Sequence, residues 1–313
     1  MLSIVVPVMN EEEVLPLFYK ELTTEVKKLK KAYEIIFIDD GSRDNSLSIL
    51  QSFAKSDKTI RIFSFRRNLG KAEALTYGFA VAKGDHVVML DADLQDKPSE
   101  ISQLLKKFDD GYEVVCGWRK DRKDTGFKVV TSRIFNKTVG LLFGLQLHDY
   151  NCGLKAFTND AAKSLRLYGG LHRFIPLLCY QQGFRVTEVP VHHAPRTLGK
   201  SKYNFTKVWT EIPDMFTMIF IIKYSKRPLH FFGIIGSIVS LVGTSIVIYF
   251  TLLHMLTGKS IGGRPLLFIG MLCVLAGMQI FFTGFLADFI LNISQSSRKV
   301  EESMEDVVKY KNS

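Results

Sequence analysis

The sequence has few cysteines, and their spacing fits neither a disulfide framework nor a metal site. Its 313 residues include Cys116, Cys152, Cys179 and Cys273, which lie far apart. This usage is typical of a reducing compartment and argues against a small disulfide-stapled secreted fold. A chain of this length can instead form an α/β domain of ordinary size with an additional segment.

Two motifs, each typical of a particular class of enzyme, are absent from the sequence. No Gly-x-Gly-x-x-Gly follows the first predicted strand, where the run 7–12 reads Pro-Val-Met-Asn-Glu-Glu, and this disfavours a dehydrogenase. Neither Trp118 nor Trp209 lies in a Gln-x-x-Arg-Trp motif. A processive polysaccharide synthase, which also needs more membrane spans than this chain offers, is therefore disfavoured.

Acidic residues are in deficit. The chain has 41 Lys and Arg against 31 Asp and Glu, for a net charge of +10. We find no basic stripe with interleaved aromatic residues and no DNA-reading motif, so we do not expect a nucleic acid partner. Anionic lipid headgroups and a phosphorylated substrate account for the charge more economically.

Charged residues are missing altogether from two long stretches, Leu229–Leu253 and Leu266–Ala287. Both exceed the roughly 18 apolar residues that indicate a membrane-spanning helix. A buried helix of a soluble core is the alternative, but it is rare at this length. The turn-like segment 257–265 joins the two stretches. We therefore predict a two-helix transmembrane hairpin within 229–293, with spans of about 231–256 and 266–290.

Positive charges flank this hairpin more densely than they occupy its connection, which favours a cytoplasmic side for both flanks. The flanking residues are Lys223, Lys226, Arg227, Arg298 and Lys299, and the connection holds Lys259 and Arg264. We predict a multi-pass protein of the inner (plasma) membrane, with its N-terminal domain and its tail, 294–313, in the cytoplasm. The segment 206–228 is rich in aromatic residues at helical spacing and is predicted to lie in the membrane interface. A core helix of the soluble domain is the alternative for it.

Strand and helix patterns alternate along residues 1–205. Apolar strand candidates at 3–8, 34–39, 60–65 and 85–90 are separated by amphipathic stretches such as 12–29 and 71–82. This alternation predicts an α/β domain with a mainly parallel sheet covered by helices. Ligands of such sheets bind beyond the carboxyl ends of the strands. Polar clusters follow each predicted strand, at Asn10, Asp39–Asp40, Arg66–Asn68 and Asp91–Asp93.

Asp91 and Asp93 follow the apolar run 86–90 and are two residues apart, so they share a face where the backbone is still extended. Two close carboxylates are costly unless a cation lies between them. Ligand sets made only of oxygen suit Mg²⁺ or Mn²⁺. A solvated loop would be the better interpretation if this motif stood alone.

It does not stand alone. The chain resembles the family 2 glycosyltransferases of GT-A fold, and four segments carry this resemblance: 4–12, 38–42, 67–71 and 90–96, the last of which contains Asp91 and Asp93. Later motifs narrow the resemblance to polyprenyl-phosphate sugar transferases, similar to the dolichyl-phosphate mannose and glucose synthases and to bacterial undecaprenyl-phosphate transferases of the O-antigen glucosylation and aminoarabinose types. These motifs are 117–119, 132–136, 149–155, 171–176, 189–196 and 199–203.

The resemblance implies a role for each matching residue. Pro7, Asn10 and Glu12 would shape the nucleotide pocket, and Asp39 would contact the base. Asp40 would contact the same region, or it would only brace the turn through Gly41. The metal would be held by Asp91, Asp93 and Gln95, and Lys71 would contact the nucleotide or its phosphates unless it is a surface lysine that opens a helix.

Phosphate recognition is implied for a set of mostly cationic residues, because guanidinium forks match phosphate oxygens. The phosphate-binding residues would be Arg119, Ser132, Arg133, Arg196 and Lys202.

The resemblance implies a different role for Asp149. It would orient the sugar or the acceptor, or act as an optional base, and a purely structural role is the alternative.

The implied reaction is inverting transfer of one sugar from a nucleotide-diphosphate sugar to a polyprenyl phosphate, with undecaprenyl phosphate as the expected lipid. UDP-glucose is the first expectation for the donor. GDP-mannose and another UDP-sugar, such as a 4-amino-arabinose derivative, are alternatives. A non-catalytic membrane scaffold is a further alternative, against which the intact polar motifs argue. The sequence leaves oligomeric state open, a homo-oligomer included.

Overall fold

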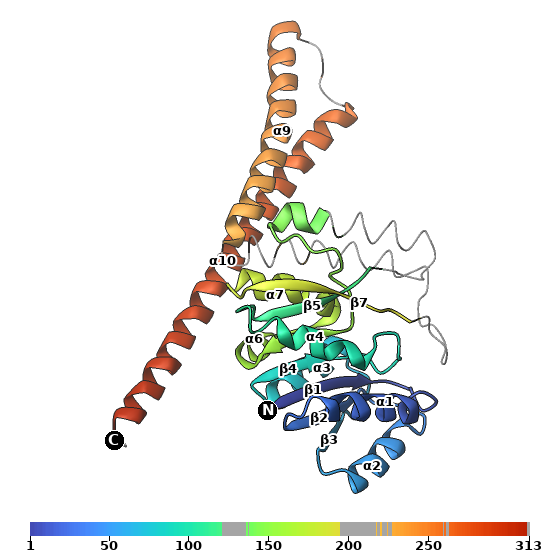
Figure 1. Ribbon diagram of the computed structural model, residues 1–313. Coiled ribbons are helices and arrows are strands. Elements are labelled where there is room, and N and C mark those ends of the chain that lie inside the picture. The colour runs from blue at the N-terminus through green and yellow to red at the C-terminus, as the bar shows by residue number, and fades with distance from the viewer. Residues whose placement is uncertain are drawn as a thin grey trace. The chain divides into compact units, whose positions relative to one another are not determined.

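The computed structural model describes residues 1–120, 136, 138–194, 217, 220, 224, 227–258, 260 and 263–311. The chain divides into two compact units, Met1–Asp214 and Met215–Ser313 (Figure 1). A sheet covered by helices forms the described part of the first unit, and two long helices dominate the second.

The sheet has seven strands among the described residues, in the order β3-β2-β1-β4-β6-β5-β7. All of them except β6 run in the same direction, and β6 is antiparallel to both of its neighbours. The mainly parallel sheet predicted from the sequence is confirmed. The strands are β1 (Leu2–Val8), β2 (Tyr33–Asp39), β3 (Ile60–Ser64), β4 (His86–Met89), β5 (Val114–Arg119), β6 (Lys155–Thr158) and β7 (Val186–Val191).

Helices connect the strands and cover both faces of the sheet. Ile4 and Val6 of β1 share a core cluster with Phe18 of α1. The alternate residue, Val5, faces α3, where Gly78 comes so close that an added Cβ would lie 2.4 Å from the Val5 side chain. The helices of this unit whose bounds lie wholly within the described residues include α1 (Leu15–Lys28), α2 (Ser46–Ser56), α3 (Lys71–Val81), η1 (Pro98–Glu100), α4 (Ile101–Lys106), α6 (Asn159–Ser164), η2 (Gly169–Phe174) and α7 (Ile175–Gln181).

One edge of the sheet gathers the chain segments that carry the polar motifs. The carboxyl ends of β1, β2, β4 and β5 lie at this edge because these strands are parallel to one another. The antiparallel strand β6 begins there, with Lys155 paired to Met89 and Cys116. Segments that are far apart in the sequence therefore meet at this edge, as a ligand site requires.

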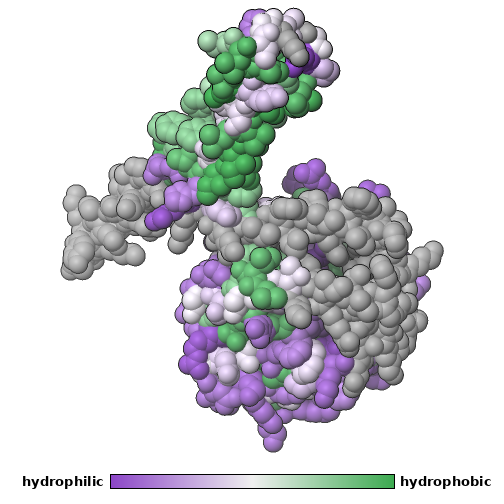
Figure 2. Space-filling view, turned by 90° about the horizontal axis from the view of Figure 1, so that it is seen from above, coloured by the Kyte–Doolittle hydropathy of each residue, from purple (hydrophilic) through white to green (hydrophobic). Residues whose placement is uncertain are grey.

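The second unit is a helical hairpin of α9 (Pro228–Thr257) and α10 (Pro265–Lys311). Two stretches of it, Pro228–Thr257 and Pro265–Ile293, are long and apolar enough to span a membrane, each with a mean hydropathy of 2.2. Most of their apolar side chains are exposed, and the face of the helices seen in Figure 2 is mainly hydrophobic. No protein core covers this surface in the described part of the chain, which favours the membrane hairpin over buried core helices. The predicted interfacial segment, 206–228, lies almost wholly outside the described residues.

Glycines hold the two helices of the hairpin in close contact. A Cβ added at Gly236 would lie 2.6 Å from the Gly277 carbonyl oxygen, and one at Gly243 would lie 2.5 Å from that of Gly270. Small residues allow such backbone approach, and in a membrane this packing replaces the hydrophobic driving force.

A matched pair of alanine variants tests this packing. Gly236→Ala is expected to lower the melting temperature of the purified protein in detergent, because its methyl group would displace α10. At Gly233 the nearest atom to an added Cβ is 3.7 Å away, so Gly233→Ala should leave the melting temperature unchanged or raise it slightly. Equal effects of the two substitutions would show that the hairpin is not packed through Gly236.

Candidate active site

Asp39 and Asp40, at the end of β2, organise the loops on this side of the sheet edge. Asp39 accepts hydrogen bonds from the Ser64 hydroxyl at 2.7 Å and from a backbone N–H at 3.2 Å. Asp40 accepts from the backbone N–H groups of Leu69 at 2.7 Å and of Gly70 at 3.0 Å. Burial raises the pKa of Asp40, although these hydrogen bonds oppose the rise. Asp40 thus braces the loop that leads into α3.

Asn10 and Glu12 join the loop after β1 to the loop after β2. The Asn10 side-chain oxygen accepts from the backbone N–H of Arg43 at 2.8 Å, and the Asn10 backbone N–H donates to the Ser42 hydroxyl at 2.9 Å. The Glu12 carboxylate accepts from the backbone N–H of Asn45 at 2.8 Å. The two loops, with Pro7 at the end of β1, therefore form one wall of the candidate site.

Asp91 lies directly opposite Lys71, the first residue of α3. The Lys71 ammonium donates to both carboxylate oxygens, at 2.5 and 2.7 Å. Burial acts to raise the pKa of Asp91, but the charge and hydrogen bonds of Lys71 outweigh it and lower that pKa. The sequence placed both residues at the site without indicating that they pair.

The turn after Asp91 has an uncommon backbone conformation. Leu94 adopts a φ of 58°, in the left-handed region that residues with a Cβ rarely occupy. Its side chain is buried, which holds the conformation in place. Within the same turn the backbone N–H of Gln95 donates to the Asp93 carboxylate at 3.2 Å. The turn therefore presents Asp91, Asp93 and Gln95 on a fixed loop.

The oxygen atoms of this turn fit a hard divalent cation. A Cβ added at Gly153 would lie 2.5 Å from an Asp91 oxygen and 2.7 Å from an Asp96 oxygen. The two carboxylates therefore approach Gly153 so closely that no larger residue would fit there. Within the described ranges, no group of three or more His, Cys, Asp or Glu side chains is arranged to hold a metal ion. A bound ion must therefore draw further ligands from the Gln95 amide, from water or from substrate phosphates.

Arg119, the last residue of β5, forms a bidentate ion pair with Asp149. Its Nε donates at 2.6 Å and its Nη2 at 3.0 Å to the two carboxylate oxygens. Both side chains are largely buried, at 12% and 2% exposure. Burial opposes the charge of Arg119, yet the Asp149 carboxylate raises the pKa of the guanidinium. Asp149 also accepts from the backbone N–H of Asn151 at 3.0 Å, so three donors engage its oxygens.

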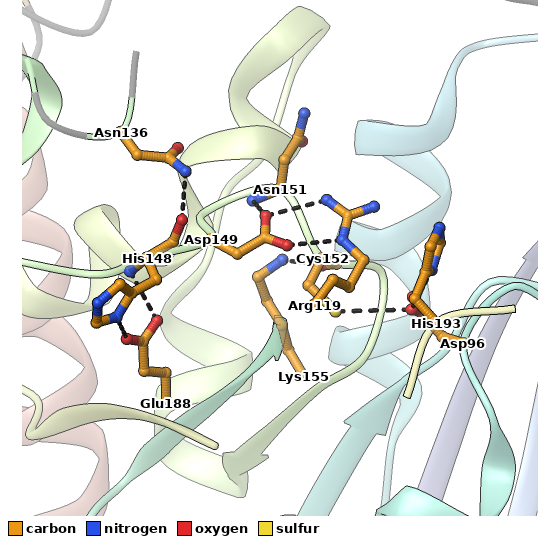
Figure 3. A network of polar contacts seen from close by, with 10 residues as sticks. All are labelled: Asp96, Arg119, Asn136, His148, Asp149, Asn151, Cys152, Lys155, Glu188 and His193. Carbon is orange, nitrogen blue, oxygen red and sulfur yellow. Dashed lines mark hydrogen bonds and ion pairs between the residues drawn. The ribbon is translucent and has the colours of Figure 1, made fainter. Parts of the chain in front are cut away.

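A second layer of polar contacts lies around this pair (Figure 3). Lys155, fully buried at the start of β6, donates to the Cys152 carbonyl. The Cys152 thiol lies 3.7 Å from Asp96, whose carboxylate is 3.5 Å from the buried His193 ring. The sequence alone indicates no chemical role for these residues and favours a strand position for His193, which in the structure lies just beyond the end of β7. Only their places within the motifs 90–96, 149–155 and 189–196 pointed to them.

On the other side of Asp149, the chain is held by His148. Both its backbone N–H and its ring contact Glu188 of β7, and the ring stacks on Trp118 with 4.1 Å between centroids. Its carbonyl accepts from the Asn136 side chain. These contacts fix the backbone that carries Asp149 against β5 and β7.

Besides the loops after β1 and β2, which carry Asn10, Glu12, Asp39 and Asp40, the structure brings predicted residues together in two ion-paired groups. One joins Lys71 to Asp91 and the turn that follows it, and the other joins Arg119 to Asp149. Four predicted residues lie outside the described part of the chain, namely Ser132, Arg133, Arg196 and Lys202.

Comparison with known proteins decides the family. The model of glycosyl transferase family 2 matches residues 3–166, more than half of the chain. The chain belongs to this family. A dodecaprenyl-phosphate galacturonate synthase from Rhizobium johnstonii is 32% identical over 294 residues, which cover 92% of this chain and 87% of the relative. This chain is accordingly a glycosyltransferase, and the resemblance to polyprenyl-phosphate sugar transferases is confirmed.

Solved structures of the glucosyl-3-phosphoglycerate synthase from Mycobacterium tuberculosis share the fold. Its complex with Mn²⁺ and UDP-glucose has a TM-score of 0.54 at 20% identity, covering 70% of this chain and 78% of that one. Its complex with UDP has the same TM-score and identity, covering 70% and 79%. The GT-A fold expected for the first unit of the family 2 enzyme is confirmed.

Proposed function

We propose that this family 2 enzyme transfers a single sugar from a nucleotide-diphosphate sugar to a polyprenyl phosphate, with inversion at the anomeric carbon. The extent of the similarity to the Rhizobium synthase carries the proposal. The 294 aligned residues exceed the 214 of the first unit, so the match must continue into the apolar hairpin. A relative that is named for a polyprenyl-phosphate sugar and aligns through this region supports a lipid acceptor for this chain.

The proposed reaction asks little of the protein as a base. A lipid monophosphate is substantially dianionic near neutral pH, so its oxygen is already a nucleophile. The enzyme must instead bring two anions together and align the acceptor oxygen with the anomeric carbon, opposite the leaving nucleoside diphosphate. One displacement then forms the sugar–phosphate bond and breaks the bond to the diphosphate, without a covalent enzyme intermediate.

Lys71 and the turn after β4 would serve the donor diphosphate. The residues that would hold a divalent ion are Asp91, Asp93 and Gln95, because their oxygens fit Mg²⁺ or Mn²⁺. Such an ion, when bound, neutralises charge on the leaving diphosphate. The Lys71 ammonium lies at the same place and would add a second cationic contact to the phosphate oxygens.

Arg119 would serve the acceptor phosphate, and Asp149 would position Arg119. Asp149 binds the Nε and Nη2 groups, which leaves Nη1 of the guanidinium for a phosphate oxygen. With three donors on its oxygens, Asp149 is poorly suited to accept a proton from substrate. We further propose that Ser132, Arg133, Arg196 and Lys202 contribute to phosphate binding.

The wall formed by the loops after β1 and β2 would hold the nucleoside. Pro7, Asn10 and Glu12 line its first loop, and Asp39 would meet the base. The hydrogen bonds of Asp40 to the loop before α3 support a bracing role for that carboxylate. UDP-glucose is the donor that we propose first. GDP-mannose, a 4-amino-arabinose derivative and, from the printed name of the relative, a galacturonate donor are the alternatives.

The test is transfer by the purified, detergent-solubilised protein. Undecaprenyl phosphate is supplied with each of UDP-glucose, UDP-galacturonate, UDP-4-amino-arabinose and GDP-mannose, and the product is identified by mass spectrometry. One donor should give a lipid monophosphate sugar, and its anomeric configuration, determined by NMR, should be the inverse of that in the donor. Release of free sugar without a lipid product from every donor would refute the lipid acceptor.

The topology of the protein decides whether its active site meets the nucleotide sugars of the cytoplasm. We propose a cytoplasmic catalytic domain (1–205), an interfacial segment (206–228) and a hairpin that returns the tail to the same side. Single cysteines at Ser260 and Ser313, in a background with Cys273 replaced, test this arrangement. A membrane-impermeant maleimide added to intact cells should label Ser260→Cys and spare Ser313→Cys. The reverse pattern would place the active site outside, away from cytoplasmic nucleotide sugars.

A further inference from the structure

His172 belongs to a sequence motif to which the proposed mechanism assigns no role. It lies in the 3-10 helix η2, directly before α7, with its ring Nδ1 at 3.2 Å from the Gly169 carbonyl oxygen. A carbonyl can only accept a hydrogen bond, so Nδ1 must carry the proton and donate it. The other nitrogen, Nε2, then carries a proton only if the ring is charged.

The surroundings keep the ring neutral. Burial first, and then the positive charges of Lys71 and Arg173, lower the pKa of His172 to about 3, against smaller opposing contributions from the Gly169 carbonyl and Asp91. At neutral pH the ring is therefore the Nδ1–H tautomer, with a lone pair on Nε2. Among the residues that the structure describes, Gly169 alone is a hydrogen-bond partner of the His172 ring.

η2 is fastened to the beginning of α3, the helix that carries Lys71. The Gly169 N–H contacts the Glu73 carboxylate at 3.5 Å. The Thr76 hydroxyl donates to the Leu167 carbonyl at 3.1 Å and accepts from the Leu167 N–H at 2.9 Å. These contacts hold the His172 ring within the electrostatic reach of the Lys71–Asp91 pair.

We propose that Nε2 of His172 accepts a hydrogen bond from a hydroxyl group of the donor sugar and so helps to select among nucleotide sugars. This inference rests on the proposed function, since it assigns a group to the sugar of the same donor. A neutral nitrogen with a lone pair cannot donate to phosphate, and phosphate oxygens are served by Lys71. A sugar hydroxyl is a donor of matching chemistry, next to the diphosphate that Lys71 and the turn after Asp91 would bind.

Binding measurements test this without any acceptor. Calorimetry of the full-length protein with UDP-glucose, UDP-galactose, UDP-galacturonate, GDP-mannose and the matching nucleoside diphosphates finds the donor whose sugar adds affinity. Deoxyfluoro analogues of that donor, each lacking one hydroxyl donor, are then compared between the wild type and His172→Asn. Asparagine keeps an N–H near the Nδ1 position but has no acceptor at the Nε2 position.

At one sugar position the wild type should lose about tenfold in affinity for the deoxyfluoro analogue, and His172→Asn should show no such loss there. At the other positions both proteins should lose equally. His172→Gln, which can place an oxygen near the Nε2 position, should restore part of the discrimination. Affinity for the nucleoside diphosphate alone and for Mn²⁺ should be unchanged, as should all values in His86→Asn, a control at the opposite end of β4.

Parallel losses in the wild type and His172→Asn at every sugar position would overturn the inference. So would a donor panel in which no sugar adds affinity over its nucleoside diphosphate, or a fall in Mn²⁺ affinity in His172→Asn, which would make the ring a metal ligand. A wild type that discriminates among the analogues but transfers nothing to undecaprenyl phosphate would refute the proposed acceptor and leave the role of His172 standing.

Discussion

Asparagine in place of Asp93 is expected to reduce turnover by about a hundredfold or more while the protein remains folded. The substitution replaces a charged ligand with a neutral amide on a turn whose backbone is already fixed by the buried Leu94. Initial rates with saturating donor and acceptor, measured over a series of Mg²⁺ and Mn²⁺ concentrations, provide the test. The variant should need far more metal than the wild type, and its remaining activity should be greater with Mn²⁺.

Binding of Mn²⁺, followed by its electron paramagnetic resonance signal, separates a metal ligand from a residue that only shapes the turn. In the wild type, UDP should increase Mn²⁺ affinity because its phosphates complete the ligand set, and in Asp93→Asn this increase should disappear. Asp109→Asn, at an exposed position after α4, is the matched control and should behave as the wild type. Full activity of the wild type in excess chelator would refute the metal assignment altogether.

Substitution of Asp91 should affect more than metal binding, unlike substitution of Asp93, because Asp91 also pairs with Lys71. Asp91→Asn removes a candidate metal ligand and leaves the Lys71 ammonium without its counterion. The sequence placed both carboxylates on one face of an extended segment, and periodicity alone allowed that inference. It could not show that one of them is paired with a lysine from a helix 20 residues earlier, since this contact depends on where α3 crosses the sheet.

The strands could be predicted because their apolar runs are continuous. β1, β2 and β4 consist largely of buried residues, which is the pattern of a parallel sheet covered on both faces. β6 could not be predicted, since its four residues include the charged Lys155 and carry no periodicity of their own. Its place between β4 and β5 is set by long-range pairing, which no local pattern encodes.

The same limit applies to the second layer of the site. Lysine and aspartate are usually exposed, so residue type alone would place Lys155 and Asp96 at the surface. In the structure both are buried. Their burial depends on partners, a backbone carbonyl for one and a thiol and an imidazole for the other. The motifs that carry the family resemblance contain these residues, but only the fold shows which atoms meet.

The pair of Arg119 and Asp149 leads to the second large expected effect. Asp149→Asn should lower both turnover and the melting temperature of the protein. The amide would turn an N–H group toward the guanidinium and leave a largely buried cation without its counterion, a change that costs about 3–5 kcal/mol in other proteins. Arg119→Lys keeps the charge but cannot supply two parallel N–H donors, so it should also lower turnover by at least tenfold. Asp110→Asn, in the exposed pair with Lys107, is the control and should change the melting temperature little.

The pH dependence of turnover distinguishes a positioning role for Asp149 from a catalytic base. If Asp149 only holds Arg119, the acidic limb of the kcat/KM profile reflects the second ionisation of the acceptor phosphate, near pH 6, and Asp149→Asn should lower the whole profile without moving that limb. If Asp149 accepts the proton, the limb should vanish in the variant. A double variant, Arg119→Lys with Asp149→Asn, adds a second criterion, because residues that act as one pair lose less together than the sum of their single losses. Loss of the limb with additive losses would establish Asp149 as a base, and an unmoved limb with strong coupling would establish that it positions the guanidinium.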